Sequence, residues 1–331
     1  MEARPLVVIP FAPWSAAVAP DSPNLRLSPG VGSAADAYYL AMVVTFASLR
    51  RTNPALRLQL TTTAMPPAHY RRVLDRLEVE VRVVAFAHRP IGSSIKTFIT
   101  SFYSLDALQA TSDDPAAVML LDPDVICLGA LGRLFDRVGD GVGAYEIDYP
   151  VDESINGISR REAGHLQGLL DADFVGIPRH YGGEVYVSGQ ARRAELLRHS
   201  DVAWEFSMRR FGGGHRGFTT EEHIFSYALR RVGTVVPLQG DIARIWTART
   251  WRRVPANLDE LVLWHLPAEK GRGLARLGRM VLSRVDAFAT LSDEDFAVVV
   301  GHAVGVPHRR LGRWSGDTVA RVGKLARRLV T

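Results

Sequence analysis

The sequence predicts an α/β fold with a largely parallel sheet. In the first part of the chain, segments that resemble strands alternate with segments whose apolar residues recur at helical spacing. In order, they are a strand at 6–10, a helix at 34–51, a strand at 56–62, a helix at 68–77 and a strand at 79–86. Such an order builds a parallel sheet through right-handed crossovers.

Separate features support these elements. The first strand is apolar and is followed by a loop rich in Pro and Ser. In 34–51 the apolar side chains recur at helical spacing, and Asn53-Pro54 ends the helix. The two later strands alternate apolar with polar side chains, which is typical of a sheet. A further helix is expected over 91–108, before the next apolar run.

That run, at 118–128, is the most informative stretch of the chain. It is short and is bounded by acidic residues and Gly129, so we interpret it as a strand buried on both faces. Side chains two positions apart on an extended segment point to the same side, so the carboxylates of Asp122 and Asp124 should converge. Pro123 strengthens this expectation, because it favours an extended conformation at the residue before it.

A converging pair of carboxylates favours a bound cation. Two carboxylates about 4 Å apart repel each other by about 4 kcal/mol at an effective dielectric near 20. A buried strand end tolerates this repulsion poorly without a proton or a cation. Oxygen ligands suit Mn²⁺ or Mg²⁺, and a site with few carboxylates leaves coordination positions open for phosphates. The alternative is that Asp-Pro-Asp only turns the chain after a strand.

The composition narrows the class of protein. Of the 331 residues, 47% are hydrophobic and 23% charged, which is typical of a globular chain that buries a core. The single cysteine, Cys127, excludes an intramolecular disulfide and argues against a zinc site. No apolar run reaches the roughly 18 residues of a membrane span, and Pro10 and Pro13 interrupt the stretch that most resembles a secretory signal. We therefore expect a cytoplasmic protein.

The basic character belongs to the C-terminal part. Residues 271–331 hold 11 Lys and Arg against 5 Asp and Glu, whereas the first 270 residues hold 29 against 30. This part has a helical pattern and ends in a basic amphipathic segment at 319–329. The segment would either cap the domain in solvent or make a peripheral contact with an anionic membrane surface. Nucleic-acid binding is not expected, because the basic excess is confined to the tail and no common motif is present.

The central stretch also carries a family resemblance. Residues 120–135, LLDPDVICLGALGRLF, resemble the D-x-D segment of retaining glycosyltransferases of family 8, the glycogenin and bacterial galactosyltransferase kind. The resemblance implies the GT-A fold, a Rossmann-like, mostly parallel mixed sheet flanked by helices, over residues 1–270. Residues 271–331 would then form a basic helical extension. In that family the two carboxylates hold a metal that bridges the donor diphosphate, and the first carboxylate, here Asp122, also approaches the ribose.

Further site residues follow from the same resemblance. Phe11, at the end of the first strand, would contact the nucleotide base, and Lys96 would contact a phosphate. Glu221, in the TTEEHIFS segment at 219–226, stands where the family has an acid that faces the donor sugar. His265 would be the remaining protein ligand of the metal, and Lys270 would contact the diphosphate, although their spacing of five differs from the family's six.

Each of these assignments has a plainer alternative. Lys96 would be a solvated surface residue and Phe11 a packed aromatic. Glu221 and Glu222 would only complement the helix dipole, and it stays open which of the two faces the donor. A lone histidine after an apolar run, such as His265, is more often structural than a ligand.

Other stretches depart from the family or stay ambiguous. The strand at 181–189 resembles the family segment that lines the donor sugar, but it lacks the Asn of that segment and has Gly182 near its place. We interpret the second D-x-D, at 171–173, as unrelated to the site. The glycine-rich stretch at 211–217 would be a linker or a lid. Three tryptophans near the predicted histidine would line an acceptor groove or pack in the core: Trp246, Trp251 and Trp264.

The sequence therefore predicts a metal-dependent, retaining glycosyltransferase of polysaccharide biosynthesis. It would move a hexose from a nucleotide-diphosphate sugar, a UDP-hexose or GDP-mannose, to a sugar or oligosaccharide acceptor, with Mn²⁺ or Mg²⁺ as cofactor. Two alternatives stay open. One is a phosphatase of the haloacid dehalogenase kind, although that family continues its D-x-D with Gly-Thr near the N-terminus. The other is a non-catalytic protein of GT-A fold that docks through its basic tail.

Overall fold

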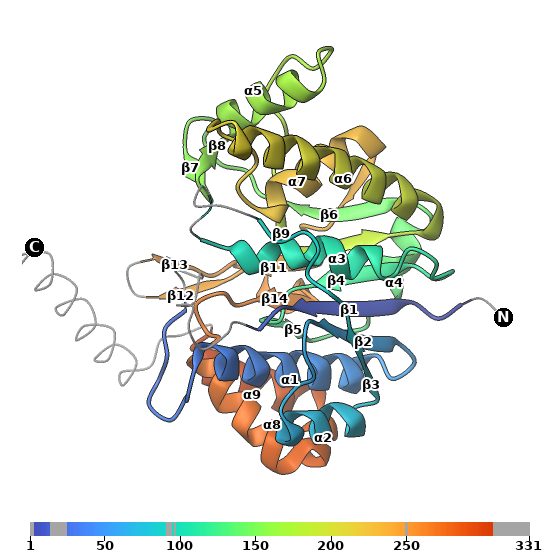
Figure 1. Ribbon diagram of the computed structural model, residues 1–331. Helices are drawn as coiled ribbons and strands as arrows, with labels where there is room; N and C mark the ends of the chain where they lie inside the picture. The colour runs from blue at the N-terminus through green and yellow to red at the C-terminus, as the bar shows by residue number, and fades with distance from the viewer. Residues whose placement is uncertain (1–2, 14–24, 91–94, 96, 249–250, 307–331) are drawn as a thin grey trace, which may run out of the picture.

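The computed structural model describes residues 3–13, 25–90, 95, 97–248 and 251–306 (Figure 1). Seven strands form a mixed sheet in the spatial order β10-β6-β9-β4-β1-β2-β3. β9 runs antiparallel to both of its neighbours, and the other neighbouring pairs are parallel. The predicted α/β class with a mostly parallel sheet is confirmed. The strands are β1 (Leu6–Phe11), β2 (Arg57–Thr62), β3 (Val79–Val83), β4 (Val118–Leu121), β6 (Val142–Glu146), β9 (Tyr181–Ser188) and β10 (Val235–Pro237).

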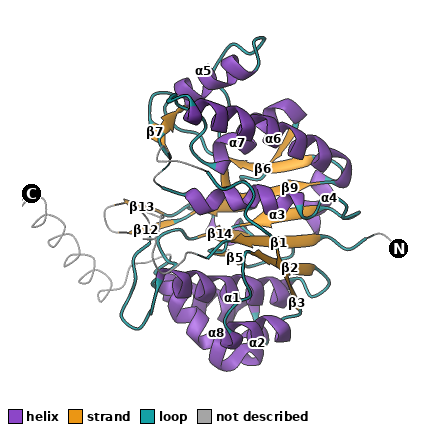
Figure 2. Ribbon diagram, in the orientation of Figure 1, coloured by secondary structure: helices purple, strands orange, loops and turns teal. Residues whose placement is uncertain are grey.

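Helices cover both faces of this sheet (Figure 2). On one face lie α1 (Ala34–Thr52), α2 (Ala68–Arg76), α4 (Gly132–Val138), α8 (Gly273–Ala289) and α9 (Asp293–Val304). On the other lie α3 (Tyr103–Gln109), α5 (Arg160–Leu170), α6 (Gln190–Gly212) and α7 (Glu221–Val232). The alternation of β1 separates the two cores, because Val7 and Ile9 join the first and Leu6 and Val8 join the second.

Helix α1 is buried along most of its length. Its N-terminus is capped by Ser33, whose hydroxyl accepts a hydrogen bond of 3.1 Å from the amide of Asp36. Helix α8 packs closely on α1, since a Cβ added at Gly278 would lie only 2.4 Å from the carbonyl oxygen of Leu40. The apolar side chains of α8 and α9 share one core with α1, so this core continues across residue 270. The basic segment predicted at 319–329 lies outside the described residues.

A second, three-stranded sheet has the order β11-β14-β5. Its strands are β11 (Ile242–Arg244), β14 (Leu263–His265) and β5 (Val125–Cys127). The interpretation of 118–128 as one strand is therefore wrong: the run divides into β4 and β5, which belong to different sheets, with a turn between them. The described chain also contains two small hairpins, β7 (Ser154–Ile155) with β8 (Ile158–Ser159) and β12 (Trp246–Ala248) with β13 (Trp251–Arg253).

The helix predicted over 91–108 is shorter than expected. The structure has a 3₁₀ helix, η1 (Ile99–Phe102), which leads into α3. Phe98 immediately before it adopts a left-handed conformation with φ of 57°, which a continuous α-helix does not permit. Another 3₁₀ helix, η2 (Leu258–Glu260), precedes β14. Lys96 lies outside the described residues.

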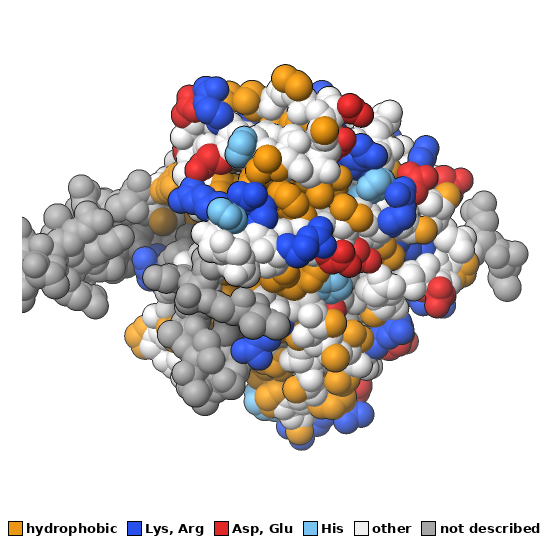
Figure 3. Space-filling view, turned by 45° about the horizontal axis from the view of Figure 1, so that its top comes forward, with side chains coloured by type: hydrophobic (Ala, Val, Ile, Leu, Met, Phe, Trp, Pro, Cys, Tyr) orange, Lys and Arg blue, Asp and Glu red, His pale blue; other side chains and the backbone are white. Residues whose placement is uncertain are grey.

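No helix in the described part of the chain combines the length and apolar character needed to span a membrane. Figure 3 shows basic, acidic and hydrophobic side chains together on the visible face. This mixture agrees with the nearly balanced charge of the first 270 residues, which hold 29 Lys and Arg against 30 Asp and Glu.

Candidate active site

The acidic motif forms the turn between β4 and β5. The amide of Asp122 donates to the carbonyl of Glu184 on the neighbouring strand, at 3.1 Å. The hydroxyl of Thr45 on α1 donates to the carbonyl of Pro123, at 2.9 Å, and holds the turn from the other side. The carboxylates of Asp122 and Asp124 therefore converge because the chain turns, and not because they alternate along one strand.

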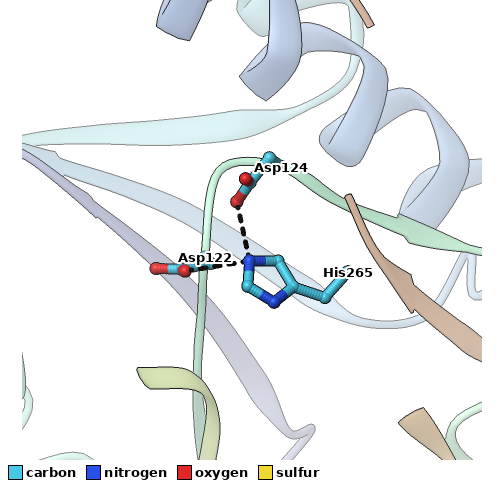
Figure 4. Close-up of side chains that lie close together, drawn as sticks. All are labelled: Asp122, Asp124 and His265. Carbon is cyan, nitrogen blue, oxygen red and sulfur yellow. Dashed lines mark ion pairs between the residues drawn. The ribbon is translucent and has the colours of Figure 1, made fainter. Parts of the chain in front are cut away.

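Strand pairing brings His265 to this turn. β14 lies antiparallel to β5 with His265 opposite Val125, and the amide of Leu266 donates to the carbonyl of Asp124 at 3.0 Å. As a result, Nε2 of His265 lies 3.4 Å from Oδ2 of Asp122 and 3.3 Å from Oδ1 of Asp124 (Figure 4). The three predicted ligand atoms all lie within 4.8 Å of one another.

Positive groups balance the buried carboxylates. Burial alone would raise the pKa of Asp124, but the charges of Lys270 and His265 outweigh it and hold this pKa below its usual range. Burial also disfavours a charged His265, yet Asp124 and Asp122 raise the pKa of the imidazole well above its ordinary value. The pKa of Asp122 is raised, chiefly by burial. Without a metal, the protonated form of His265 is therefore favoured beside the two carboxylates.

These residues fit a divalent cation. Oδ1 of Asp124 is buried and has no hydrogen-bond partner among the described residues, although a buried oxygen normally has one. Two carboxylates and an imidazole nitrogen around one point are a common ligand set for such an ion. A cation bound there would replace the proton on Nε2 and supply the missing partner of Asp124. The ammonium of Lys270 contacts the other carboxylate oxygen of Asp124, Oδ2.

The turn opens into a cleft with roughly 950 Å³ of empty space, part of it shared with solvent. The lining combines the acidic turn, the end of β1, the start of α1, the 3₁₀ helix η1 and the start of α7. Its aromatic and charged members include Phe11, Tyr38, Phe98, Asp122, Asp124, Glu221, Glu222, Arg244, Trp246, His265 and Lys270.

One end of the cleft is aromatic. The rings of Phe11 and Tyr38 stack with their centres 5.5 Å apart and an interplanar angle of 16°. The ammonium of Lys270 lies 5.3 Å from the centre of the Tyr38 ring, on the path from the aromatic pair to the acidic turn. This end therefore combines flat apolar faces with a nearby cation, which suits a base attached to phosphates.

The two acids of α7 have different surroundings. Oε1 of Glu222 accepts from the amide of Gly183 at 2.9 Å and from Arg244 at 3.0 Å, and its Oε2 accepts from the side-chain amide of Asn156 at 2.6 Å. Oε2 of Glu221, by contrast, is buried and has no hydrogen-bond partner in the described part of the chain. Burial and the charge of Glu222 raise the pKa of Glu221 to about 8. Glu222 is thus held in a network, while Glu221 presents a neutral carboxyl group to the cleft.

The sequence analysis did not single out Glu184 and Arg244, which extend this network. Glu184 on β9 is fully buried, and Arg244 on β11 donates to both of its oxygens, at 2.9 and 2.6 Å. Burial alone would raise the pKa of Glu184, but Arg244 and His265 lower it to about 2. An acid inside the apolar strand 181–188 was the available signal, since such a residue needs a buried partner.

Two glycines of this strand, Gly182 and Gly183, lie against the same network. A Cβ at Gly182 would lie 2.0 Å from Oε2 of Glu184, and a Cβ at Gly183 would lie 2.6 Å from Oε1 of Glu221. Both distances are shorter than real Cβ contacts, so a side chain at either position would force these carboxylates to shift.

The remaining candidates divide between site, core and surface. Trp246 lines the cleft and stacks on Trp251 with ring centres 5.5 Å apart, and Trp251 is 61% exposed. Trp264, in contrast, is buried in the core. Asp171 of the second D-x-D forms ion pairs with Arg230 and Arg231 and is not part of the cleft lining.

The structure thus belongs to a recognisable class. An open sheet with one reversed strand and an acidic turn after its central strand is the GT-A fold, which the sequence resemblance had implied. Comparison with family models of protein sequences finds no match, and comparison with curated protein sequences finds none either.

Comparison with solved structures identifies particular proteins of this class. An active-site mutant of LgtC superposes with a TM-score of 0.50 at 14% identity, covering 89% of this chain and 99% of LgtC. The galactosyltransferase LgtC in complex with donor and acceptor sugar analogues matches with a TM-score of 0.48 at 16% identity, over 94% of this chain and 99% of LgtC. Apo mouse xyloside xylosyltransferase 1 matches with 0.46 at 14% identity, over 80% and 97%. The predicted resemblance is confirmed for the fold.

Proposed function

We propose that this protein is a metal-dependent glycosyltransferase that moves a hexose from a nucleotide-diphosphate sugar to a sugar or oligosaccharide acceptor. The observation that carries the proposal is the convergence of Asp122, Asp124 and His265, with Lys270 beside them, in a cleft of a GT-A fold. Retention of configuration is part of the proposal and is supported by the family resemblance of residues 120–135. The donor would be a UDP-hexose or GDP-mannose.

The donor would lie along the cleft. Its base would contact Phe11 and Tyr38, and Lys270 would face its diphosphate together with the metal end of the cleft. Lys96 stays a proposed phosphate contact outside the described residues. When bound to Asp122, Asp124 and His265, Mn²⁺ or Mg²⁺ would supply positive charge for the departing diphosphate.

Glu221 would act on the sugar. Its neutral carboxyl group can both donate and accept a hydrogen bond, and its unpartnered Oε2 is available for a sugar hydroxyl. The buried location strengthens such a bond, because no water competes for the same atoms. Glu222 is the weaker candidate, since both of its oxygens already accept hydrogen bonds.

The acceptor would approach over the tryptophan pair. The stacked rings of Trp246 and Trp251 extend from the cleft lining to the surface, and sugar rings pack on such faces. The phosphatase alternative has no support from the fold, because the sheet and the position of the acidic turn are those of the GT-A class. No observation favours it.

Calorimetric titration of UDP and GDP, each with and without Mn²⁺, tests the proposal. We expect one nucleotide to bind tightly only when Mn²⁺ is present. Asp124→Ala should abolish the metal-dependent part of this affinity, because it removes a buried ligand. The matched control is Asp173→Ala, which alters the exposed second D-x-D and should bind as the wild type does. Full metal-dependent affinity in the Asp124 variant would contradict the proposal.

A further inference from the structure

Glu184 occupies an unusual place for a carboxylate. It lies on β9, next to the end of β4, where its backbone carbonyl accepts the amide of Asp122. Its side chain is fully buried and points past the acidic turn toward the far side of His265. Oε1 of Glu184 lies 3.5 Å from Nδ1 of His265, the ring nitrogen that faces away from Asp122 and Asp124.

The two ring nitrogens of His265 have different roles at a metal site: one binds the metal and the other carries the proton. A cation between the two aspartates takes Nε2, so the ring must carry its proton on Nδ1. That nitrogen is buried and forms no hydrogen bond of normal geometry within the described residues. A buried N–H without an acceptor is costly, and hydrogen bonds at active sites are often long before the ligand binds and shorten afterwards. Glu184 is the carboxylate placed to accept this proton's hydrogen bond.

We infer that Glu184 is a positioning residue of the metal centre: it receives the Nδ1–H of His265, fixes the ring's tautomer and orientation, and so raises the affinity for a divalent cation. The inference deepens the proposed function and rests on it. Histidine ligands of metals generally donate their second N–H to a carboxylate or a carbonyl, and loss of that acceptor typically weakens metal binding 10- to 100-fold. The strand at 181–189, which includes Glu184, resembles a family segment that lines the donor sugar, and that resemblance assigns no contact with the histidine.

The surroundings keep Glu184 charged and in place. A lone buried carboxylate would be strongly disfavoured, but Arg244 pairs with both oxygens in a two-pronged contact. Register determines this geometry, since Arg244 on β11 lies directly opposite His265 on β14. Glu222 accepts from the same guanidinium and fixes its position. Three strands therefore place one carboxylate, one guanidinium and one imidazole side by side.

A purely structural role for Glu184, as a partner of Arg244 alone, makes different predictions. Glu222 also binds Arg244, but among the described residues its ion pairs are with Arg244 and His180 and not with His265. Glu222→Gln is thus a matched control that disturbs the guanidinium from its other side. If Glu184 acts only through Arg244, the two substitutions should affect metal binding alike.

The experiment measures Mn²⁺ affinity of the full chain without nucleotide, from the electron paramagnetic resonance signal of free Mn²⁺. We expect Glu184→Gln to weaken Mn²⁺ binding by roughly 10- to 100-fold, and Glu222→Gln, which keeps the contact between Glu184 and His265, to weaken it clearly less. In a His265→Ala background, Glu184→Gln should cause no further loss, because the residue through which it acts is gone. Circular dichroism and thermal melting check that each variant is folded.

If Glu184→Gln fails to fold because Arg244 is left without its partner, a double variant with neutral residues at both positions is used in its place. Glu184→Gln with Arg244→Met leaves no unpaired charge at these two positions, and it is compared with Arg244→Met alone, which removes the guanidinium from Glu222 to the same extent. The inference is overturned if wild type and Glu184→Gln bind Mn²⁺ equally. It is overturned as well if Glu184→Gln has the same effect with and without His265. A wild-type protein that binds no Mn²⁺ would instead refute the proposed function, and this inference with it.

Discussion

Replacing Glu221 by Gln should change how the stability of the metal-free protein depends on pH. The carboxyl group of Glu221 is buried, its Oε2 has no partner in the described chain, and the charge of Glu222 lies next to it. Burial and this charge raise its pKa from 4.5 to about 8. Gln has the shape of the protonated acid and does not titrate, so Glu221→Gln removes the effect with little change in packing.

The sign follows from proton binding. The folded protein holds the proton of Glu221 more tightly than the unfolded chain does, so this contribution to stability is complete below pH 4.5 and is lost as the pH rises through 8. Each pH unit within this window costs about 1.4 kcal/mol for one proton. The wild type should therefore lose up to about 5 kcal/mol relative to the Gln variant between the two pKa values.

The assay is urea unfolding followed by tryptophan fluorescence, in the presence of a chelator, at several pH values between about 5 and 8, the window set by the raised pKa. Other groups titrate in the same range, but they do so in both proteins and cancel in the difference. Glu195→Gln, on the exposed face of α6, serves as the control and should follow the wild type at every pH.

A constant difference between wild type and Glu221→Gln across this range would refute the reasoning. Glu221 would then be ionised throughout, and its proposed role as a neutral hydrogen-bond donor to the sugar would be lost. A difference that grows as the pH falls would have the wrong sign and would point to a stabilised carboxylate instead.

Two further predictions concern the core. Gly278→Ala should lower the free energy of unfolding by about 1–3 kcal/mol, because the new Cβ would lie 2.4 Å from the carbonyl oxygen of Leu40. The control in the same urea titration is Gly132→Ala, whose new Cβ would meet no atom within 4 Å. Equal effects of the two substitutions would contradict close packing of α8 on α1. Cys127 should resist iodoacetamide in the native protein and react once urea unfolds it, because burial raises the pKa of its thiol to about 11. Labelling is measured by mass spectrometry. Rapid labelling of the folded protein would contradict this prediction and show that this part of the core opens.

Local sequence patterns were enough to predict several features of the fold and the site. The order of strands and helices predicted the sheet, and the pair Asp122 and Asp124 marked the end of its central strand. The same pattern could not show that the run 118–128 breaks into two strands, because both halves are apolar and both are buried. The break matters, since β5 leaves the main sheet at this point and becomes the partner of β14.

Glu221 and Glu222 show a second feature of the site that the sequence could not predict. Glu221 and Glu222 are adjacent in one helical turn and look alike in the sequence. Their pKa values move in opposite directions because Glu222 meets His180, Arg244 and the amide of Gly183, while Oε2 of Glu221 meets no partner among the described residues. These neighbours come from strands far away along the chain, so no local pattern distinguishes the two acids.

The sequence by itself determined the α/β class, the acidic motif and the order in which His265 and Lys270 follow it, because periodicity and residue type act over short distances. Only the tertiary structure decided that His265 stands over the turn, that Glu184 lies behind it with Arg244, and that α8 shares the core of α1. The physical reason is that strand register and helix packing join segments far apart in the chain. Electrostatic interactions between such groups depend on distances that only the folded chain defines.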